Sequence, residues 1–474
     1  MSAIFSAEEL HSVVGGKLFK KNWIVSGIST DTREIKNNEL FVALKSKRDG
    51  NDFIFSAIEK GAKAAIINQV PIGLPSDFPY ILVSDSMKAL YAIASYSRKR
   101  YKGKLIAITG SVGKTSTKDI LTKMLSVFGL THSSPKSFNN HLGVPLTLAN
   151  IPKNTDYVVC EIGMNSKGEI EPLSKLASPD LAIITNISTA HLASFKNVKE
   201  IAREKVTICL GLKKNGLLIF SIDNQFHDFV KGFIFGKKIK SLTIGSNKIA
   251  DISLNNISFV NNKSFASLLI KNKFFSNFSV DALGYHQLLN CLAAIGVIVS
   301  YDLDLKIALK ELKSWKPRNG RGRFLDINFK KNSEDIGIRI IDESYNCNPT
   351  SLYASLEILK SAKFDSTKKL SRKIAILGDM LELGTDEIKI HREISNNENI
   401  KFFNTIHCVG SLMKELHEKL PEEKKGLLVT KAEDLISHIL INAEDRDIYL
   451  IKGSNSIGLS FMVNKIYKLN NSCF

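Results

Sequence analysis

Cysteine-based sites and membrane-spanning segments are both missing from this sequence of 474 residues. Its six cysteines lie far apart, without the C-x-x-C spacing of zinc sites or the density of a disulfide framework. No run of about 18 uncharged apolar residues occurs, so we expect no membrane span. Residues 1–19 include Glu8 and Glu9 and lack the basic-then-apolar order of a signal peptide. These absences predict a cytoplasmic protein with reduced thiols.

Clusters of basic residues interleaved with aromatic residues are also missing. The chain nevertheless carries 65 Lys plus Arg against 47 Asp plus Glu, a formal net charge of +18. Such an excess favours anionic partners, among them nucleotides, carboxylate-rich substrates, nucleic acid and anionic membranes. The lysines are spread along the whole chain, which is typical of a compositional bias on solvated faces. A nucleic-acid groove has no support beyond the net charge, and we expect no nucleic-acid partner.

The length predicts about three domains of roughly 150 residues each. Near the N-terminus, a helix pattern at 6–14 ends at a Gly-Gly pair. Strand-like runs at 39–44 and 64–67 enclose a second helix pattern at 53–61, and together these elements predict a small α/β domain. The basic segment 96–101 follows and is the expected boundary of this domain.

The central region alternates apolar strand runs with helix patterns. This alternation predicts a doubly wound parallel sheet, whose ligands bind beyond the carboxyl ends of the strands. The strand runs lie at 105–108, 157–160, 181–184 and 216–220. Short β-like runs within 242–278 predict a meander added to this sheet.

A basic segment punctuated by glycine and proline, 315–323, is the expected linker to a third domain. Apolar runs at 338–341, 374–378 and 448–451 follow it and look like buried strands. The sequence therefore predicts a C-terminal α/β domain.

The most informative segment is 109–116, Thr-Gly-Ser-Val-Gly-Lys-Thr-Ser, between an apolar run and a helix pattern. In such a strand, turn and helix start, backbone N–H groups converge on phosphate oxygens and the helix dipole favours anions. Lys114 supplies a cation, and the Thr115 hydroxyl can bind Mg²⁺. The usual motif has its first glycine where this chain has Ile108, and Gly110 is the turn glycine here. A chance Gly-Lys-Thr in a surface turn is the alternative, but the flanking elements favour a nucleoside triphosphate site.

Two further polar side chains follow strands of the predicted parallel sheet. Glu161 ends the run 157–160, and His191 lies a few residues beyond the run 181–184. Because the carboxyl ends of parallel strands meet at one edge, we expect both beside Lys114, where they suit a divalent cation. A surface or capping role for His191 is the alternative. Lys205 lies in a helical context, in which a solvated lysine is the default interpretation.

Three other segments carry candidate binding residues. The turn-rich loop 139–145 is a possible clamp for a polar substrate, or merely a turn. Segment 284–290 opens an apolar helix pattern at 291–299, so its polar side chains are placed to bind a nucleotide base. Arg321 is a candidate for a charge clamp on a transferring phosphoryl group, with Arg318 and Arg323 as competitors.

Taken together, these segments resemble the ATP-dependent Mur ligases of peptidoglycan synthesis over nearly the whole chain. The matching segments are 109–116, 139–145, 161–165, 186–191, 320–321, 342–349, 378–384 and 452–454. The resemblance implies three α/β domains: residues 1–101 for the UDP-linked substrate, 102–316 as the central P-loop ATPase domain, and 317–474 as a Rossmann-like ligase domain. It also implies a monomer that uses ATP and Mg²⁺ to join D-alanyl-D-alanine to the terminal carboxylate of a UDP-N-acetylmuramoyl-tripeptide.

The resemblance also implies roles for individual residues. Lys114, Lys205, His191 and Arg321 are the expected catalytic residues. The expected nucleotide-binding residues are Gly110, Ser111, Val112, Gly113, Lys114, Thr115, Ser116, His286, Asn290 and Arg321. Mg²⁺ is expected on Thr115, Glu161, His191 and Lys205, with Lys205 carbamylated so that a cation becomes an anionic ligand. The expected substrate residues are Asp31, Thr32, Arg33, Asp49 and Gly50 for the uridine nucleotide, and Asn140, Asn346, Asn348 and Lys452.

The chain departs from the family pattern at Asn51, Gln287 and Asn455, where the family often has histidine, asparagine and arginine. The nearest alternatives are other members of the superfamily, namely a folylpolyglutamate synthase or the ligase that adds the third stem-peptide residue. A P-loop switch or a nucleic-acid-stimulated ATPase is a more distant alternative, because it gives Glu161, His191 and Arg321 no role.

Overall fold

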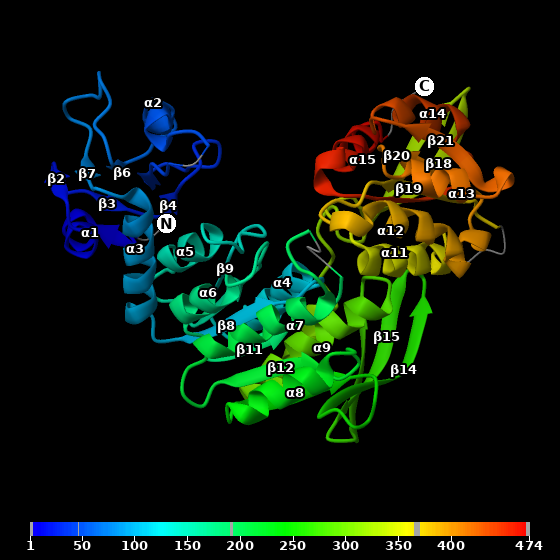
Figure 1. Ribbon diagram of the computed structural model, residues 1–474, viewed down its shortest axis with the longest axis horizontal. Coiled ribbons are helices and arrows are strands. Elements are labelled where there is room, and N and C mark those ends of the chain that lie inside the picture. The colour runs from blue at the N-terminus through cyan, green and yellow to red at the C-terminus, as the bar shows by residue number, and fades with distance from the viewer. Residues whose placement is uncertain (1–2, 46, 190–192, 365–369, 471–474) are drawn as a thin grey trace.

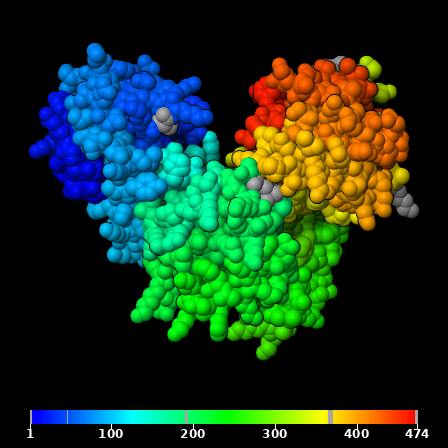
Figure 2. Space-filling model, viewed as in Figure 1, coloured from blue at the N-terminus to red at the C-terminus, as the bar shows by residue number. Residues whose placement is uncertain are grey.

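The computed structural model describes residues 3–45, 47–189, 193–364 and 370–470. Their strands form three separate larger sheets, one for each of three α/β domains, as the sequence predicts. The N-terminal domain (blue) and the C-terminal domain (orange to red) stand apart on the same side of the middle domain (Figures 1 and 2). No helix among the described residues is both long and apolar enough to span a membrane.

The N-terminal sheet has the strand order β2-β7-β6-β5-β4. These strands are β2 (Lys17–Phe19), β4 (Ile28–Ser29), β5 (Leu40–Val42), β6 (Ala64–Ile67) and β7 (Tyr80–Leu82), with β1 (Phe5–Ser6) and β3 (Ile24–Val25) forming a separate ribbon. Helix α1 (Ala7–Val14) starts at a capping box of Ser6 and Glu9 and ends at Gly15, whose φ is 68°. Segment 50–59 forms η1 (Gly50–Phe53) and α2 (Ile54–Glu59). The predicted helices and strands of this domain are confirmed.

The basic segment 96–101, the expected domain boundary, forms the end of the long helix α3 (Ser86–Arg100) and its C-cap. Arg98 is 7% exposed and donates hydrogen bonds to the carbonyls of Ala177 (2.5 Å), Ser178 (2.7 Å) and Tyr101 (3.3 Å). Arg100 binds the carbonyls of Ile4 and Ile151. These guanidinium groups therefore attach α3 to the middle domain instead of facing solvent.

We expect Arg98→Ala to lower the free energy of unfolding by about 3 kcal/mol, because it leaves buried carbonyls without a donor. Urea unfolding of the full chain measures this change. Lys99→Ala, on the exposed side of the same helix, is the matched control and should change stability by less than about 0.5 kcal/mol. Equal effects of the two substitutions would contradict a fastening role for Arg98.

The middle domain has a nine-stranded sheet of order β16-β15-β14-β13-β12-β11-β8-β10-β9. Seven neighbouring strands from β9 to β14 are parallel: β9 (Thr131–Ser133), β10 (Tyr157–Glu161), β8 (Lys104–Thr109), β11 (Leu181–Ile184), β12 (Leu217–Ser221), β13 (Lys240–Gly245) and β14 (Ile252–Val260). The antiparallel strands β15 (Lys263–Ile270) and β16 (Lys273–Val280) complete the predicted meander.

Both faces of this sheet are buried. Along β8, Leu105 and Ala107 join one hydrophobic cluster, whereas Ile106 and Ile108 join another on the opposite face. Helices α5 (Gly143–Ala149), α6 (Ile170–Ala177), α7 (Val198–Val206) with η2 (Thr207–Gly211), and α8 (His227–Gly236) cover the first face. Helices α4 (Lys114–Leu125), α9 (Tyr285–Ser300) and α10 (Leu305–Leu312) cover the second. This is the predicted doubly wound arrangement.

The C-terminal sheet has the order β17-β18-β22-β19-β20-β21. Its strands are β17 (Arg323–Lys331), β18 (Glu334–Glu343), β19 (Lys373–Gly378), β20 (Thr405–Val409), β21 (Lys425–Val429) and β22 (Ile448–Lys452), and all but β17 run parallel to their neighbours. The α-helices are α11 (Pro349–Ser361), α12 (Glu387–Glu393), α13 (Lys414–Lys419), α14 (Asp434–Asn442) and α15 (Leu459–Lys468). The short 3-10 helices are η3 (Gly384–Asp386), η4 (Ile394–Asn396), η5 (Glu398–Phe402), η6 (Glu422–Lys424) and η7 (Asn455–Ile457).

Candidate active site

A cavity of about 460 Å³ lies between the middle and C-terminal domains. The middle domain contributes the turn after β8, the end of β10, the segments after β11 and β12, and the first turns of α9. The C-terminal domain contributes the linker, the end of β18, the start of α11 and the end of β22. Carboxyl ends of parallel strands from two domains therefore face one cavity, the location that α/β folds use for ligands.

The turn between β8 and α4 depends on two glycines with positive φ. Gly110 has φ 154° and Gly113 has φ 86°. A Cβ atom at Gly110 would overlap the Thr185 hydroxyl, and one at Gly113 would overlap the Asn290 side-chain oxygen. Neighbouring segments hold this turn, because Ser111 donates from its N–H to the Asn186 carbonyl (2.8 Å). The result is a close-packed backbone turn at a helix N-terminus, which suits phosphate.

The Lys114 ammonium folds back onto this turn and donates to the Gly110 carbonyl at 2.7 Å. Burial lowers the pKa of Lys114, Glu161 opposes this shift and the Arg321 cation adds to it. In the part of the chain that the structure describes, no carboxylate lies within ion-pair distance of this ammonium, so an anionic ligand would stabilise it most.

Thr115 and Glu161 form a buried pair at the bottom of the cavity. The Thr115 hydroxyl donates to one carboxylate oxygen of Glu161 at 2.8 Å, and the Asn139 amide donates to the other at 2.7 Å. Glu161 is only 1% exposed. Among the residues that the structure describes, no group of three or more His, Cys, Asp or Glu side chains is arranged to hold a metal ion. A hydroxyl and a single carboxylate nevertheless fit Mg²⁺, which usually keeps several waters and shares phosphate oxygens with the protein.

Lys205 is not the solvated lysine that its helical context favours. It is 1% exposed on α7, and the contact of its ammonium is to the Met164 sulfur at 3.8 Å. The adjacent carboxylate of Glu204 instead accepts the N–H groups of Gly168 (2.8 Å) and Ile170 (2.9 Å). Burial and the Lys114 cation lower the pKa of Lys205 well below its ordinary 10.5, which favours a neutral, nucleophilic amine. His191, the partner expected beside it, lies outside the described residues.

The first turns of α9 line the opposite side of the cavity. Asn290 lies against Gly113 and accepts a hydrogen bond from the Thr117 hydroxyl at 3.3 Å. Burial, together with the nearby Lys452 cation, lowers the pKa of His286 to about 4. The helix begins at Tyr285, within the segment 284–290 that was expected to open it. His286 and Asn290 therefore face the cavity from the helix itself.

Two cavity residues on this side were missed at the sequence level. Asp223 accepts a hydrogen bond from the Tyr285 hydroxyl at 2.6 Å, and the neighbouring Asn224 donates to the Asn186 amide oxygen at 2.5 Å. Both line the cavity and follow directly after β12. Glu161 was located by looking for polar residues at the carboxyl end of a parallel strand. The same rule was sufficient to find Asp223 and Asn224.

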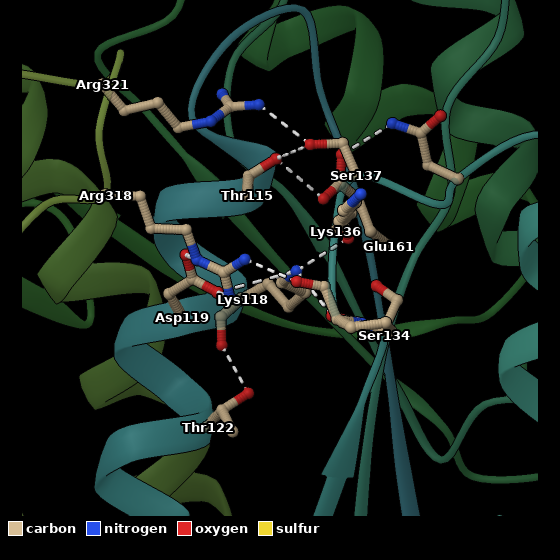
Figure 3. A network of polar contacts seen from close by, with 12 residues as sticks. Thr115, Lys118, Asp119, Thr122, Ser134, Lys136, Ser137, Glu161, Arg318 and Arg321 are labelled. Carbon is tan, nitrogen blue, oxygen red and sulfur yellow. Dashed lines mark hydrogen bonds and ion pairs between the residues drawn. The ribbon is translucent and has the colours of Figure 1, made fainter. Parts of the chain in front are cut away.

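The three competing arginines have different partners, and Figure 3 shows those of Arg318 and Arg321. Arg321 lines the cavity, donates to the Ser137 hydroxyl at 2.9 Å and lies over the Tyr345 ring at 4.2 Å. Arg318 pairs with Asp119 at 2.6 Å, and Arg323 donates to Asn319 at 2.7 Å. Of these three arginines, Arg321 lines the cavity and Arg318 and Arg323 do not.

The expected substrate residues fall into two groups. Asn346, Asn348 and Lys452 line the cavity, and the Lys452 ammonium donates to the Asn346 carbonyl at 3.0 Å. Asn140 does not line it: its side-chain oxygen accepts the N–H groups of Leu142 and Gly143 at the start of α5, and the cavity residue of this loop is Asn139. Part of the expected turn 139–145 is thus helical.

The residues expected to bind the uridine nucleotide lie in loops of the N-terminal domain and at the start of η1, and they are not part of this cavity. Asp31 and Arg33 form an ion pair at 2.6 Å. Asp49 accepts the N–H of Asn51 at 2.9 Å, and Gly50 packs against the backbone of Leu44. Glu34, which follows Arg33, forms an ion pair with Lys136 of the middle domain. The loop that contains Asp31, Thr32 and Arg33 therefore faces the segment before α5.

A phosphate-binding turn, a threonine–glutamate pair and cations from two domains around one cavity define a nucleotide-dependent group-transfer enzyme. The family model for the Mur ligase middle domain matches residues 108–298, and the model for the Mur ligase, glutamate ligase domain matches residues 329–455. The chain belongs to the Mur ligase family.

Curated relatives of this chain carry the name UDP-N-acetylmuramoyl-tripeptide–D-alanyl-D-alanine ligase. The protein from Rickettsia prowazekii (strain Madrid E) is 32% identical over 92% of this chain and 94% of the relative. The protein from Bacillus subtilis (strain 168) is 31% identical over 94% and 93%. Among solved structures, MurF from Acinetobacter baumannii has a TM-score of 0.82 at 25% identity and covers 98% of this chain and 99% of its own. MurF ligase from Thermotoga maritima in complex with ADP has a TM-score of 0.75 at 25% identity, with 93% and 97% covered.

Proposed function

We propose that this protein is the ATP-dependent ligase that joins D-alanyl-D-alanine to the terminal carboxylate of UDP-N-acetylmuramoyl-tripeptide, a step in peptidoglycan precursor synthesis. The observation that carries the proposal is the convergence of Lys114, Glu161 and Arg321 with C-terminal-domain residues on one cavity. Relatives with this activity in their names match the chain over at least nine-tenths of its length. The enzyme class thus follows from the site, and the choice of substrates from the similarity.

A carboxylate needs activation because it is a poor electrophile. In the proposed reaction, a carboxylate oxygen attacks the γ-phosphorus of ATP and the bond to the β-phosphate oxygen breaks, giving an acyl phosphate and ADP. The amine of D-alanyl-D-alanine then attacks the acyl carbon, loses a proton and expels phosphate, leaving an amide. Lys114 and Arg321 are the cations that neutralise charge on the phosphoryl group during transfer.

Thr115 and Glu161 are the described residues that would hold Mg²⁺, which neutralises charge on phosphate oxygens when bound. We propose His191 and a carbamylated Lys205 as the further metal-binding groups. Carbamylation forms a bond between the neutral Lys205 amine and CO₂ with loss of a proton, and the product is an anion. The surroundings of Lys205 support this assignment, because among the described residues no carboxylate lies within ion-pair distance of its ammonium.

The remaining assignments belong to the same proposal. Asp31, Thr32, Arg33, Asp49 and Gly50 would bind the uridine nucleotide, and Asn140, Asn346, Asn348 and Lys452 would bind the peptide parts. The proposed domains are residues 1–101, 102–316 and 317–474, in a monomer located in the cytoplasm. His286 and Asn290 would face the adenine, since both line the cavity and Asn290 lies against Gly113.

We expect the purified protein, given ATP, Mg²⁺, the tripeptide nucleotide and D-alanyl-D-alanine, to form a UDP-linked pentapeptide detectable by mass spectrometry. A dipeptide nucleotide offered separately should give no product, which distinguishes this ligase from the one that adds the third residue. Omission of D-alanyl-D-alanine is the control. ATP hydrolysis that DNA or RNA stimulates and that ignores the dipeptide would refute the proposal.

A further inference from the structure

The loop Ser134–Ser137, between β9 and α5, touches groups from distant parts of the chain (Figure 3). At its end, the Ser137 hydroxyl lies 3.0 Å from the Thr115 hydroxyl and accepts a hydrogen bond from Arg321 at 2.9 Å. Thr115 gives its only hydroxyl proton to the acceptor-only carboxylate of Glu161, so Ser137 must donate to Thr115. The bonds therefore run in one direction, from Arg321 through Ser137 and Thr115 to Glu161.

Three successive carbonyls of this loop are bound by two cations. The Lys118 ammonium, fully buried on α4, donates to the carbonyls of Ser134 (2.9 Å) and Lys136 (3.0 Å). Arg318 of the linker donates to the carbonyl between them, that of Pro135, at 2.6 Å. Asp119 pairs with Arg318 at 2.6 Å and lies 3.6 Å from Lys118, so one carboxylate lies within ion-pair distance of both cations. We name this arrangement the carbonyl clamp.

The clamp fixes the backbone immediately before Ser137, and the linker that carries Arg318 also carries Arg321. We propose that Ser137 is a positioning residue that holds Arg321 in the nucleotide cavity, on a loop fixed by the carbonyl clamp. The inference rests on the proposed function, because Arg321 acts there as a cation for the transferred phosphoryl group. It adds a residue to which neither the sequence motifs nor the resemblance gives a role.

Ser137→Ala should lower kcat of the ligase reaction at least about tenfold, because the Arg321 guanidinium loses the partner that orients it. Ser137→Thr keeps the hydroxyl and should retain most of the wild-type rate. Ser134→Ala is the matched control: it deletes the same atom from the same loop, and the Ser134 hydroxyl has no hydrogen-bond partner among the described residues. Thermal unfolding of each variant shows whether the fold is retained.

Two measurements distinguish positioning from mere loop stability. In a double-mutant cycle, Ser137→Ala should add little to Arg321→Ala, since both remove the same interaction. By calorimetry, Ser137→Ala should lower the affinity for a non-hydrolysable ATP analogue about fivefold while the affinity for ADP stays unchanged, because the proposed function assigns Arg321 to the terminal phosphate, which ADP lacks. Additive effects in the cycle, or a Ser137→Ala protein that matches Ser134→Ala, would overturn the inference. Calorimetry measures nucleotide binding and does not depend on the ligase reaction. It therefore tests the role of Ser137 separately from the proposed function.

Discussion

Replacing Lys114 with alanine is expected to lower the rate of ligation by about 10²- to 10³-fold, with the fold intact. The ammonium lies on the phosphate-binding turn, 2.7 Å from the Gly110 carbonyl, and no carboxylate of residues 3–45, 47–189, 193–364 or 370–470 lies within ion-pair distance of it. Its charge is thus directed at the ligand, where removal of one charge-stabilising donor typically costs on the order of 3 to 4 kcal/mol of transition-state stabilisation. Initial rates of ADP and pentapeptide formation at saturating ATP measure the loss.

Lys123→Ala provides the matched control, because Lys123 lies on the same helix, is 41% exposed and pairs with Glu311 at 3.1 Å. This variant should retain the wild-type rate within about twofold, since exposed ion pairs contribute little. Lys114→Arg keeps the charge but changes its shape, and it should recover only part of the rate. A Lys114→Ala enzyme that ligates the dipeptide at the wild-type rate would show that phosphoryl transfer does not use this cation.

The fold and half of the cavity could be predicted because parallel strands obey a simple geometric rule. Alternating apolar runs located β8, β10, β11 and β12, and the carboxyl ends of neighbouring parallel strands meet at one edge. That rule brought Glu161 to the turn that carries Lys114 and Thr115, and the structure confirms this proximity. The same rule applied to β12 would have found Asp223 and Asn224.

The parts that sequence reasoning missed depend on contacts between distant segments. Arg318 binds the carbonyl of Pro135 and Arg321 binds Ser137, both across more than 180 residues. Hydrophobic periodicity does not reveal contacts between such distant residues. The basic, Gly- and Pro-punctuated segment 315–323 has the composition of an ordinary linker. The composition of the basic end of α3 likewise does not show that Arg98 is buried, because charged side chains are mostly exposed, whereas Arg98 donates to carbonyls of the middle domain.

Lys205 shows a different limit of sequence reasoning. In the nine-residue helix α7, five residues are buried, so a helical pattern this short does not show which face the lysine occupies. A lysine in such a pattern is expected to be solvated. The packed structure shows instead that Lys205 is buried beside Met164, and that the Glu204 carboxylate accepts hydrogen bonds from backbone N–H groups. The resemblance to a ligase family, and not the pattern, singled it out.

Replacing Lys205 with alanine is expected to reduce ligation at least about a hundredfold, because the proposed carbamate is a metal-binding anion that alanine cannot form. A short carboxylate such as acetate should restore part of the rate in the variant, since it fits the space left by the side chain and supplies anionic oxygens. Lys199→Ala, on the exposed side of the same helix, should be fully active and indifferent to acetate. A fully active Lys205→Ala enzyme would contradict the carbamate.

The carbamate can also be observed without measuring activity. Carbamylation needs the neutral amine, and burial lowers the pKa of Lys205 well below 10.5, so a larger neutral fraction exists near neutral pH than for a free lysine. That fraction falls as the pH drops through the lowered pKa, so the modification should be lost on acidification and return with bicarbonate at higher pH. Carbon-13 NMR of protein equilibrated with labelled bicarbonate should show a carbamate signal that is present in Lys199→Ala and absent in Lys205→Ala. An identical signal in both variants would place the modification on another lysine and leave the second metal-binding anion of the site to be supplied by a different residue.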